Sequence, residues 1–252
     1  MTIAFIIAGA VIVLLALAAW RRTGSATYLL LIAGSVFCTM NEPWLDIPAK
    51  IWHARSDNFP LLIEFGRPMP LWVPLAYMLF FGALPAILLM ALRRGAGYRN
   101  VWISVACFWL LNAVVELGLT GPGKMYTYYG YQPFAVGHWS PDQLVTNGAG
   151  IVGIVYVLTK APKLFQGKRS LLVVPLVPAT QIAALGVGIP GFWVINMDVA
   201  HVWQWIGMGA TLVLGVFVID SMLRDLTGLP QRGLGPDQAR AGAGSEKSKL
   251  PV

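Results

Sequence analysis

The side chains best suited to chemistry are carboxyls at the edges of apolar stretches. Glu42 and Asp46 follow one such stretch and are four residues apart, so both can face the same space if the segment is helical. Glu116 lies late in another apolar stretch, four residues after Asn112. Burial raises the pKa of a carboxyl into the range where it can act as a general acid. We therefore expect Glu42, Asp46 and Glu116 to be catalytic, with Glu42 as the acid and Asp46 or Glu116 as the base.

The same carboxyls also fit structural roles. Glu42 can cap a helix while Asp46 pairs with Lys50 at a spacing of four. Asn112 and Glu116 can join two helices through hydrogen bonds without touching a substrate. Polar groups near apolar spans are costly to bury, and for that reason we favour a functional role for Glu42 and Asp46, while both alternatives stay open for Asn112 and Glu116.

Further polar side chains near the same edge are candidates for contact with a substrate. The set is Asn41, Asn112, Tyr128, Tyr129, Asn147, Asp198, His201 and Gln204. The tyrosines belong to a tyrosine-rich loop at 125–134, and such residues can line a pocket or form an aromatic belt at a bilayer surface. Asp198 precedes His201 by three residues, so it can charge a proton-carrying histidine or equally cap a helix.

Several other chemistries have no sequence support. The chain has no phosphate-binding loop, no H-E-x-x-H zinc motif, no aspartate-rich diphosphate motif, and no lysine in its last apolar stretch for a retinal Schiff base. Cys38 and Cys107 lie in apolar stretches without C-x-x-C spacing. We expect His53 and His138 to be exposed loop residues. The sequence thus predicts a site with no metal and no cofactor.

The composition indicates the elements that must position these residues. Hydrophobic residues make up 57% of the 252 residues and charged residues 12%, against about 25% charged in soluble domains. A membrane-crossing helix needs roughly 20 apolar residues. The candidate stretches are 3–20, 27–41, 70–92, 101–119, 141–158, 171–189 and 199–223. We predict an all-α, multi-pass bundle of seven transmembrane helices within residues 1–226.

The basic residues predict the orientation of this bundle in the cell membrane. Arg21 and Arg22 directly follow the first apolar stretch, and no basic residue precedes it, which favours an uncleaved span over a signal peptide. With seven spans, 14 Lys and Arg fall on one side and 4 on the other. The positive-inside rule then places the N-terminus outside and the C-terminus in the cytoplasm.

The acidic residues concentrate on the predicted outer side, which includes the long loops 43–69 and 120–140. The outer acids are Glu42, Asp46, Asp57, Glu64, Glu116, Asp142 and Asp198. We expect them to form a pocket that opens outward, next to membrane lipid.

The net charge of +7 indicates no nucleic-acid partner in a chain of this kind. Spans rich in Ala and Gly permit a homo-oligomer. The polar segment 227–252 is predicted to be a disordered cytoplasmic tail.

The motifs resemble one known family. Asn41-Glu42-Pro43 with Asp46, then Glu116, and then the Tyr128–Pro133 segment before Asn147 resemble the spirocyclase AveC-like membrane proteins of polyketide pathways, over roughly residues 30–160. The resemblance implies a membrane enzyme that cyclises a keto-diol into a spiroketal, sometimes with dehydration, without an organic cofactor. It implies a site of Glu42, Asp46, Glu116 and the Tyr128/Tyr129 pair. The loop after Phe134 departs from the family pattern, which bears on the substrate class.

The expected function is therefore an integral membrane cyclase or cyclase-dehydratase that acts on a lipophilic, polyketide- or terpenoid-like small molecule by acid–base catalysis. Size and the seven-span layout also resemble membrane-bound terpenoid cyclases. A different class, a proton-coupled carrier or binding protein for a lipophilic molecule, remains an alternative. A carrier needs polar groups through the full membrane depth, and the predicted cytoplasmic halves offer little beyond Asp220.

Overall fold

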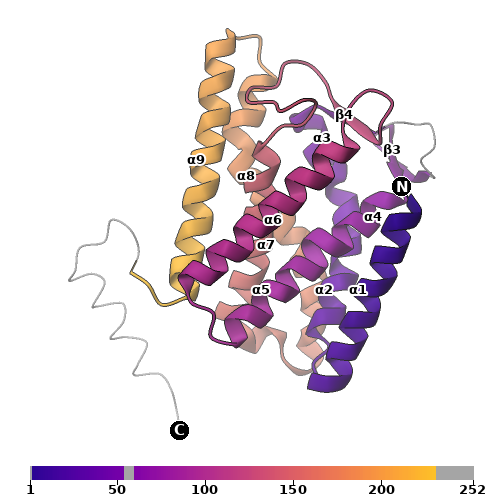
Figure 1. The fold of residues 1–252 in the computed structure, drawn as a ribbon, viewed down its shortest axis with the longest axis vertical. Helices are drawn as coiled ribbons and strands as arrows, with labels where there is room; N and C mark the ends of the chain where they lie inside the picture. Colours follow the sequence, from indigo (N-terminus) through magenta and orange to yellow (C-terminus); the bar gives the residue numbers. More distant parts are fainter. Residues whose placement is uncertain (1, 54–59, 231–252) are drawn as a thin grey trace.

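The computed structural model describes residues 2–53 and 60–230, and the chain in these ranges is mostly helical (Figure 1). The α-helices are α1 (Thr2–Thr23), α2 (Thr27–Val36), α3 (Glu42–Ala49), α4 (Trp72–Tyr77), α5 (Leu84–Arg93), α6 (Tyr98–Leu119), α7 (Asp142–Lys160), α8 (Val173–Ile195) and α9 (His201–Leu226). Short helical turns of other types are η1 (Phe37–Asn41), η2 (Met78–Ala83), η3 (Pro162–Phe165) and η4 (Gly167–Leu172). Most of the predicted tail 227–252 lies outside the described residues, as does Asp57.

All seven apolar stretches are helical, and five helices are long and apolar enough to cross a membrane. These five are Thr2–Thr23, Trp72–Arg93, Tyr98–Leu119, Gly167–Ile195 and His201–Leu226. The other two stretches differ for identifiable reasons. α2 is short and continues into the 3-10 turn η1, whereas α7 begins with polar residues, including Asp142 and Gln143. The chain therefore forms a membrane-embedded helical bundle.

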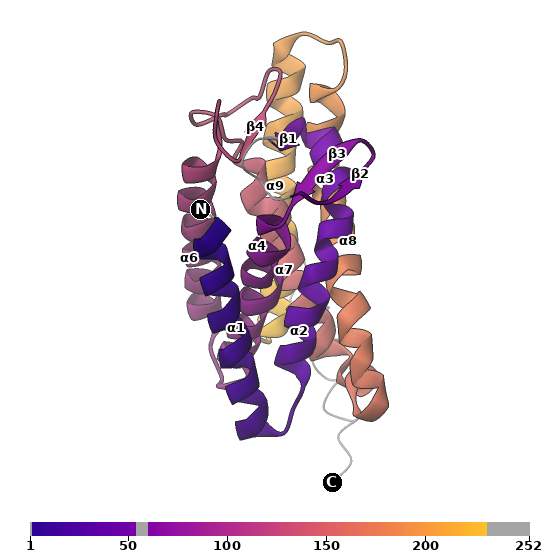
Figure 2. The same ribbon diagram turned by 90° about the vertical axis from the view of Figure 1, so that its right-hand side faces the viewer.

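The long helices run side by side along the bundle (Figures 1 and 2). α8 and α9 approach closely because small residues lie between them: a Cβ atom at Gly207 would lie 2.6 Å from the carbonyl oxygen of Pro190 and would collide with Val194. Such small-residue contacts are how helices pack in lipid, where no hydrophobic force drives them together. In contrast, α1 buries only Gly9 and Ala16 and exposes most of its apolar side chains.

The segment Trp72–Arg93 widens in its middle. η2 is a π-helical turn just before Pro85, a residue with no N–H group to donate to the carbonyl four residues earlier. Tyr77, Phe80 and Phe81 lie in and beside this turn, and all three line the same internal cavity.

The predicted loops 43–69 and 120–140 contain short strands that the prediction did not include. The strands are β1 (Ile51–His53), β2 (Pro60–Glu64), β3 (Arg67–Pro70) and β4 (Tyr126–Tyr128). β2 pairs with β3, and β1 pairs antiparallel with β4, with His53 opposite Tyr126. Two loops far apart in the sequence thus join at one end of the bundle, which we call the strand end (Figure 2).

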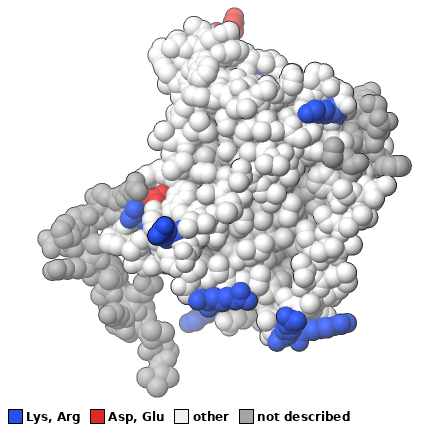
Figure 3. Space-filling model, in the orientation of Figure 1, with Lys and Arg blue, Asp and Glu red and all other residues white. Residues whose placement is uncertain are grey.

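Basic residues gather at the opposite end, which we call the basic end. Arg21 and Arg22 end α1, Arg93 ends α5, and Arg224 lies in the last turn of α9. Most of the blue surface visible in Figure 3 lies towards this end, and very little red is visible on the same face. On this face, basic side chains are therefore concentrated at one end of the bundle.

Candidate active site

An internal cavity of about 60 Å³ lies at the strand end of the bundle. Its polar wall consists of Glu42, His53, Glu116, Tyr126, Tyr128, Tyr77, Gln143 and Asn147. Apolar side chains such as Phe80 and Phe81 form the rest of the wall. No lysine or arginine lines it within the part of the chain that the structure describes. A cavity of this size holds a few water molecules.

Glu42 and Asp46 reach this region from α3, a helix whose boundaries are set by its sequence. Pro43 lies in its first turn, where the missing N–H group costs nothing, and Lys50 ends it in a left-handed conformation with φ of 57°. The carbonyl groups at its end find distant donors. Asn196 Nδ2 donates to Pro48 O at 2.7 Å, and Gln132 Nε2 donates to Ala49 O at 3.2 Å. α3 is therefore held firmly at its C-terminal end.

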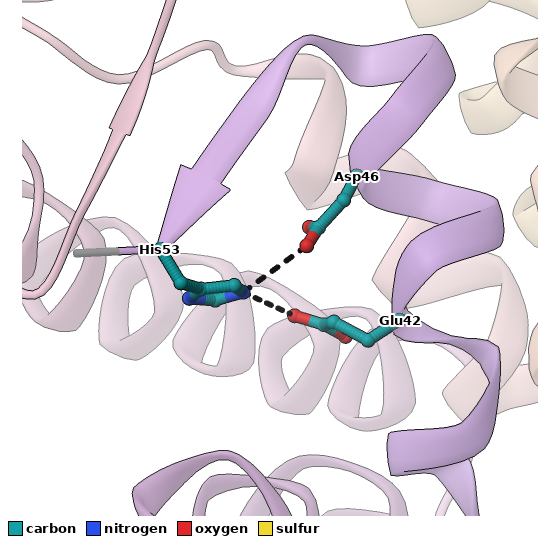
Figure 4. A group of neighbouring side chains, drawn as sticks. All are labelled: Glu42, Asp46 and His53. Carbon is teal, nitrogen blue, oxygen red and sulfur yellow. Dashed lines mark ion pairs between the residues drawn. The ribbon is translucent and has the colours of Figure 1, made fainter. Parts of the chain in front are cut away.

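The turn at Lys50 leads the chain back along α3, so that β1 carries His53 to the two carboxyls (Figure 4). His53 Nε2 lies 3.2 Å from Asp46 Oδ2 and 3.4 Å from Glu42 Oε1. The imidazole contacts the rings of Trp72 and Tyr126, each with a centroid distance of 5.5 Å. We call Glu42, Asp46 and His53 the triad.

The expectation that His53 is an exposed loop residue is wrong, because its exposed fraction is 3%. Its burial depends on the pairing of β1 with β4, some 75 residues further along the chain. Among the described residues, the ionic partner of Asp46 is this histidine and not Lys50. The structural alternative of an Asp46–Lys50 pair is therefore not what the chain adopts.

Each carboxyl on the cavity wall accepts a hydrogen bond from a tyrosine. The Tyr77 hydroxyl donates to Glu42 Oε2, and the Tyr126 hydroxyl donates to Glu116 Oε2. Burial and then the nearby Glu116 raise the pKa of Tyr126 well above its ordinary value, so this phenol stays neutral and remains a donor. The tyrosines thus fix one oxygen of each carboxyl, and the other oxygen of Glu42 faces His53.

The triad has strongly perturbed electrostatics. Burial raises the pKa of Glu42, and repulsion from Asp46 raises it further, to about 7. Burial lowers the pKa of His53, but Asp46 and Glu42 raise it by more, to about 10. Both raised pKa values are those of a site where two buried carboxylates lie close together and favour positive charge between them.

The structure brings only some of the predicted site residues together. Glu42, Glu116, Tyr128 and Asn147 line the cavity. Asp46 is completely buried next to His53 and is not part of the cavity wall.

All three predicted asparagines connect helices. Asn112 Oδ1 accepts a hydrogen bond from Asn147 Nδ2 at 3.1 Å, which joins α6 to α7. Asn41 Nδ2 donates to Pro178 O and to Gln181 Oε1, which joins η1 to α8. The structural alternative of a hydrogen bond between helices therefore describes the observed contact of Asn112.

Four other predicted residues lie away from the cavity wall. Tyr129 is 40% exposed and accepts a hydrogen bond from Arg67. Asp198 is exposed in the loop before α9, which begins at His201, and His201 stacks on Tyr131 with ring centroids 3.9 Å apart. Gln204 is buried but does not line the cavity.

Sequence reasoning did not select His53, Tyr77 or Tyr126. Tyr126 carried a usable signal, because it alternates with Tyr128 in the tyrosine-rich loop and the two side chains of a strand at that spacing share a face. Neither His53 nor Tyr77 stands in a recognisable motif.

The triad is also a group that could hold a metal ion. One ligand atom from each of its three residues lies within 4.8 Å of the others. The prediction of a site without metal overlooked this group, because its members follow no familiar metal-binding spacing.

Comparison with known proteins does not identify the chain. No family model matches it, and neither does any curated protein or solved structure.

Proposed function

We propose that this protein is a multi-pass membrane cyclase or cyclase-dehydratase that acts on a lipophilic small molecule. The observation that carries this proposal is the internal cavity at the strand end, whose wall contains Glu42 and Glu116 and no basic side chain among the described residues apart from His53. Enclosed carboxyls in a site of restricted water content are suited to moving protons between the functional groups of one substrate.

The proposed topology has seven spans, with the strand end outside and the basic end in the cytoplasm. α7 counts as a span despite its polar start because it packs against α5, α8 and α9 and needs little apolar surface of its own. α2 with η1 counts as another because it packs between α1 and α8. The Lys and Arg at the basic end support the orientation through the positive-inside rule.

In the proposed reaction, Glu116 takes the proton of an attacking hydroxyl group while the Glu42–His53 side of the cavity activates the electrophilic carbon. For a keto-diol, the first hydroxyl oxygen adds to the carbonyl carbon and gives a hemiketal. The second hydroxyl then displaces the hemiketal oxygen, which leaves as water, and a spiroketal results. Protons are moved and no electrons are exchanged, so the reaction needs no redox partner. Asp46 acts through His53, as a positioning residue.

The size of the cavity restricts how such a substrate binds. About 60 Å³ accepts a reacting group and not a carbon skeleton. A separate apolar groove of about 740 Å³ runs along the other face of α3, between Trp44 and Ile47 on that helix and Ile189 and Trp193 on α8. This groove supports the lipophilic substrate class, since its apolar lining can hold the body of such a molecule.

The test is untargeted mass spectrometry of extracts from cells that make the wild type or Glu116→Gln. We expect the variant to lose product at least ~100-fold and to accumulate a precursor of equal mass or one water heavier. The matched control is Asp225→Asn, which neutralises an acid at the basic end, where Asp225 pairs with Lys160 at 3.1 Å. Unchanged metabolites with an altered distribution between cells and medium would indicate a carrier and would overturn the proposal.

A further inference from the structure

The triad contains buried polar atoms that the protein itself does not satisfy. Apart from the ionic contacts of His53 Nε2 with the two carboxylates, no described group reaches the carboxylate oxygens of Asp46 or the ring nitrogens of His53, although the exposed fractions of these residues are 0% and 3%. His53 Nε2 faces two carboxylates at once, but a ring nitrogen has a single N–H group. Buried polar groups in native proteins almost always have partners, so a partner from outside the chain is indicated.

We propose that Glu42, Asp46 and His53 bind a divalent transition-metal ion, of the Zn²⁺ or Mn²⁺ class, in the wall of the cavity. The inference rests on the proposed function only for the role of the ion in the reaction. Binding of the ion depends on the ligand atoms alone.

The spacing of these atoms suits an ion. Bonds of about 2.0–2.2 Å from a tetrahedral ion to nitrogen and oxygen place neighbouring ligand atoms roughly 3.3–3.6 Å apart. The two observed distances from His53 Nε2 are 3.2 and 3.4 Å. One imidazole and two carboxylates form a donor set that first-row divalent ions accept. Three protein ligands leave one position open, as in catalytic rather than structural sites.

The surroundings of the triad fit the same conclusion. Tyr77 donates to Glu42 Oε2, the oxygen that does not face His53, and such outer hydrogen bonds orient metal-binding carboxylates. Trp72 and Tyr126 stack on each other and both contact the imidazole ring, which restricts its orientation. Metal binding displaces the proton of the imidazole, and two carboxylates with one neutral imidazole then have a charge that a divalent cation cancels. Since Glu42 and His53 also line the cavity, the open position of the ion faces space for water or a substrate oxygen.

In the proposed reaction the ion acts as a Lewis acid. Held by Glu42, Asp46 and His53, such an ion would supply Lewis acidity towards the oxygen of the electrophile, and Glu116 would take and return the proton. No electron transfer is involved, so a redox-inactive ion suffices.

The test uses the full chain, purified in detergent without a polyhistidine tag. Metal content is measured by inductively coupled plasma mass spectrometry, first as purified and then after treatment with EDTA and reloading with Zn²⁺ or Mn²⁺. We expect about one ion per chain. We also expect Tm to rise with the concentration of the reloaded ion, because the ion binds only the folded state.

The variants separate a metal site from general effects on folding. Asp46→Asn and His53→Gln should lose at least ~10-fold in metal affinity, while Tyr77→Phe, which keeps all three ligands, should lose less. Glu116→Gln should bind the ion like the wild type. Size-exclusion chromatography and circular dichroism show which variants are folded. If a ligand variant fails to fold, the test rests on the other two: folded Tyr77→Phe should bind the ion more weakly than the wild type, and folded Glu116→Gln should bind it equally well.

Two results would overturn the metal site. One is a wild type with less than about a tenth of an ion per chain and no change in Tm on reloading. The other is full metal binding by folded Asp46→Asn or His53→Gln, which would place the ion elsewhere. A metal-free wild type with an inactive Glu116→Gln would end the metal proposal and leave the cyclase. Stoichiometric metal in the wild type together with an active Glu116→Gln would leave the metal site and end the cyclase proposal.

Discussion

The two ends of the bundle bury acidic residues in opposite ways. At the basic end, Asp220 accepts hydrogen bonds from Tyr98, from Trp102 Nε1 at 3.2 Å and from Arg224 Nε at 2.9 Å. At the strand end, Glu42 and Asp46 share a single histidine, and neither oxygen of Asp46 has a hydrogen bond. A buried acid with a full set of hydrogen-bond donors stabilises the fold. A pair of buried acids without enough partners is typical of a functional site.

The largest effect should come from removing a metal ion at the strand end. EDTA treatment of membranes from producing cells should lower product formation about 100-fold, because the electrophile loses its Lewis acid, and Zn²⁺ or Mn²⁺ should restore it. The measurement is product by mass spectrometry against metal content of the same sample. Full activity in protein shown to be metal-free would remove this difference between the two ends.

A change at the basic end should act on stability instead. Asp220→Asn leaves Arg224 without its carboxylate and weakens the contacts of Tyr98 and Trp102, so Tm should fall by about 5 °C or more.

Product formed per folded molecule should stay within ~2-fold of wild type in Asp220→Asn, since the residue is far from the reacting atoms. Fluorescence-monitored melting and a product assay on the same preparation check both values. A loss of activity without a loss of Tm would show that the basic end takes part in function.

A smaller effect is expected for the tyrosine that holds Glu116. Tyr126→Phe removes the hydrogen bond to Glu116 while keeping the ring that packs on His53, so product formation should fall about 10-fold with little change in Tm. The pH profile of the reaction should also move, because the carboxyl loses a donor that stabilises its charged form. An unchanged profile and rate would mean that Glu116 needs no positioning.

The smallest effect is expected at Tyr129. This side chain belongs to the same loop but is exposed and contacts Arg67 outside the cavity, so Tyr129→Phe should change product formation less than ~2-fold. Assaying it beside Tyr126→Phe compares two tyrosines three residues apart. Equal losses in both variants would indicate that substrate contacts the exposed face of the loop.

Much of the fold follows from the sequence because apolar length is a local property. The seven helical stretches appear near their predicted positions, with shifts at the ends such as α8, which runs to Ile195 rather than 189. Pro43, whose missing N–H group is tolerated in a first turn, lies at the start of α3 just after the 27–41 stretch. The short strands were not predicted, since a pair such as β1 and β4 depends on contact between distant segments.

The site was predictable only where its residues share one helix. Glu42 and Asp46 lie one turn apart on α3 and were identified by their spacing. His53 was not, because its position depends on the left-handed turn at Lys50 and on strand pairing across the bundle. Asp198 and His201 show the reverse failure: the spacing suggested a pair, yet the helix begins at His201 and both side chains face solvent.

The central claim, that the strand end is built for chemistry and the basic end for stability, is tested most directly by comparing the Tm of Glu42→Gln with that of Asp220→Asn in EDTA. Glu42→Gln removes repulsion with Asp46 and keeps an oxygen that can accept from Tyr77, so its Tm should equal or exceed that of the metal-free wild type. Asp220→Asn should melt lower than the wild type. A fall in Tm for Glu42→Gln as large as that for Asp220→Asn would contradict the claim and make the triad a structural cluster.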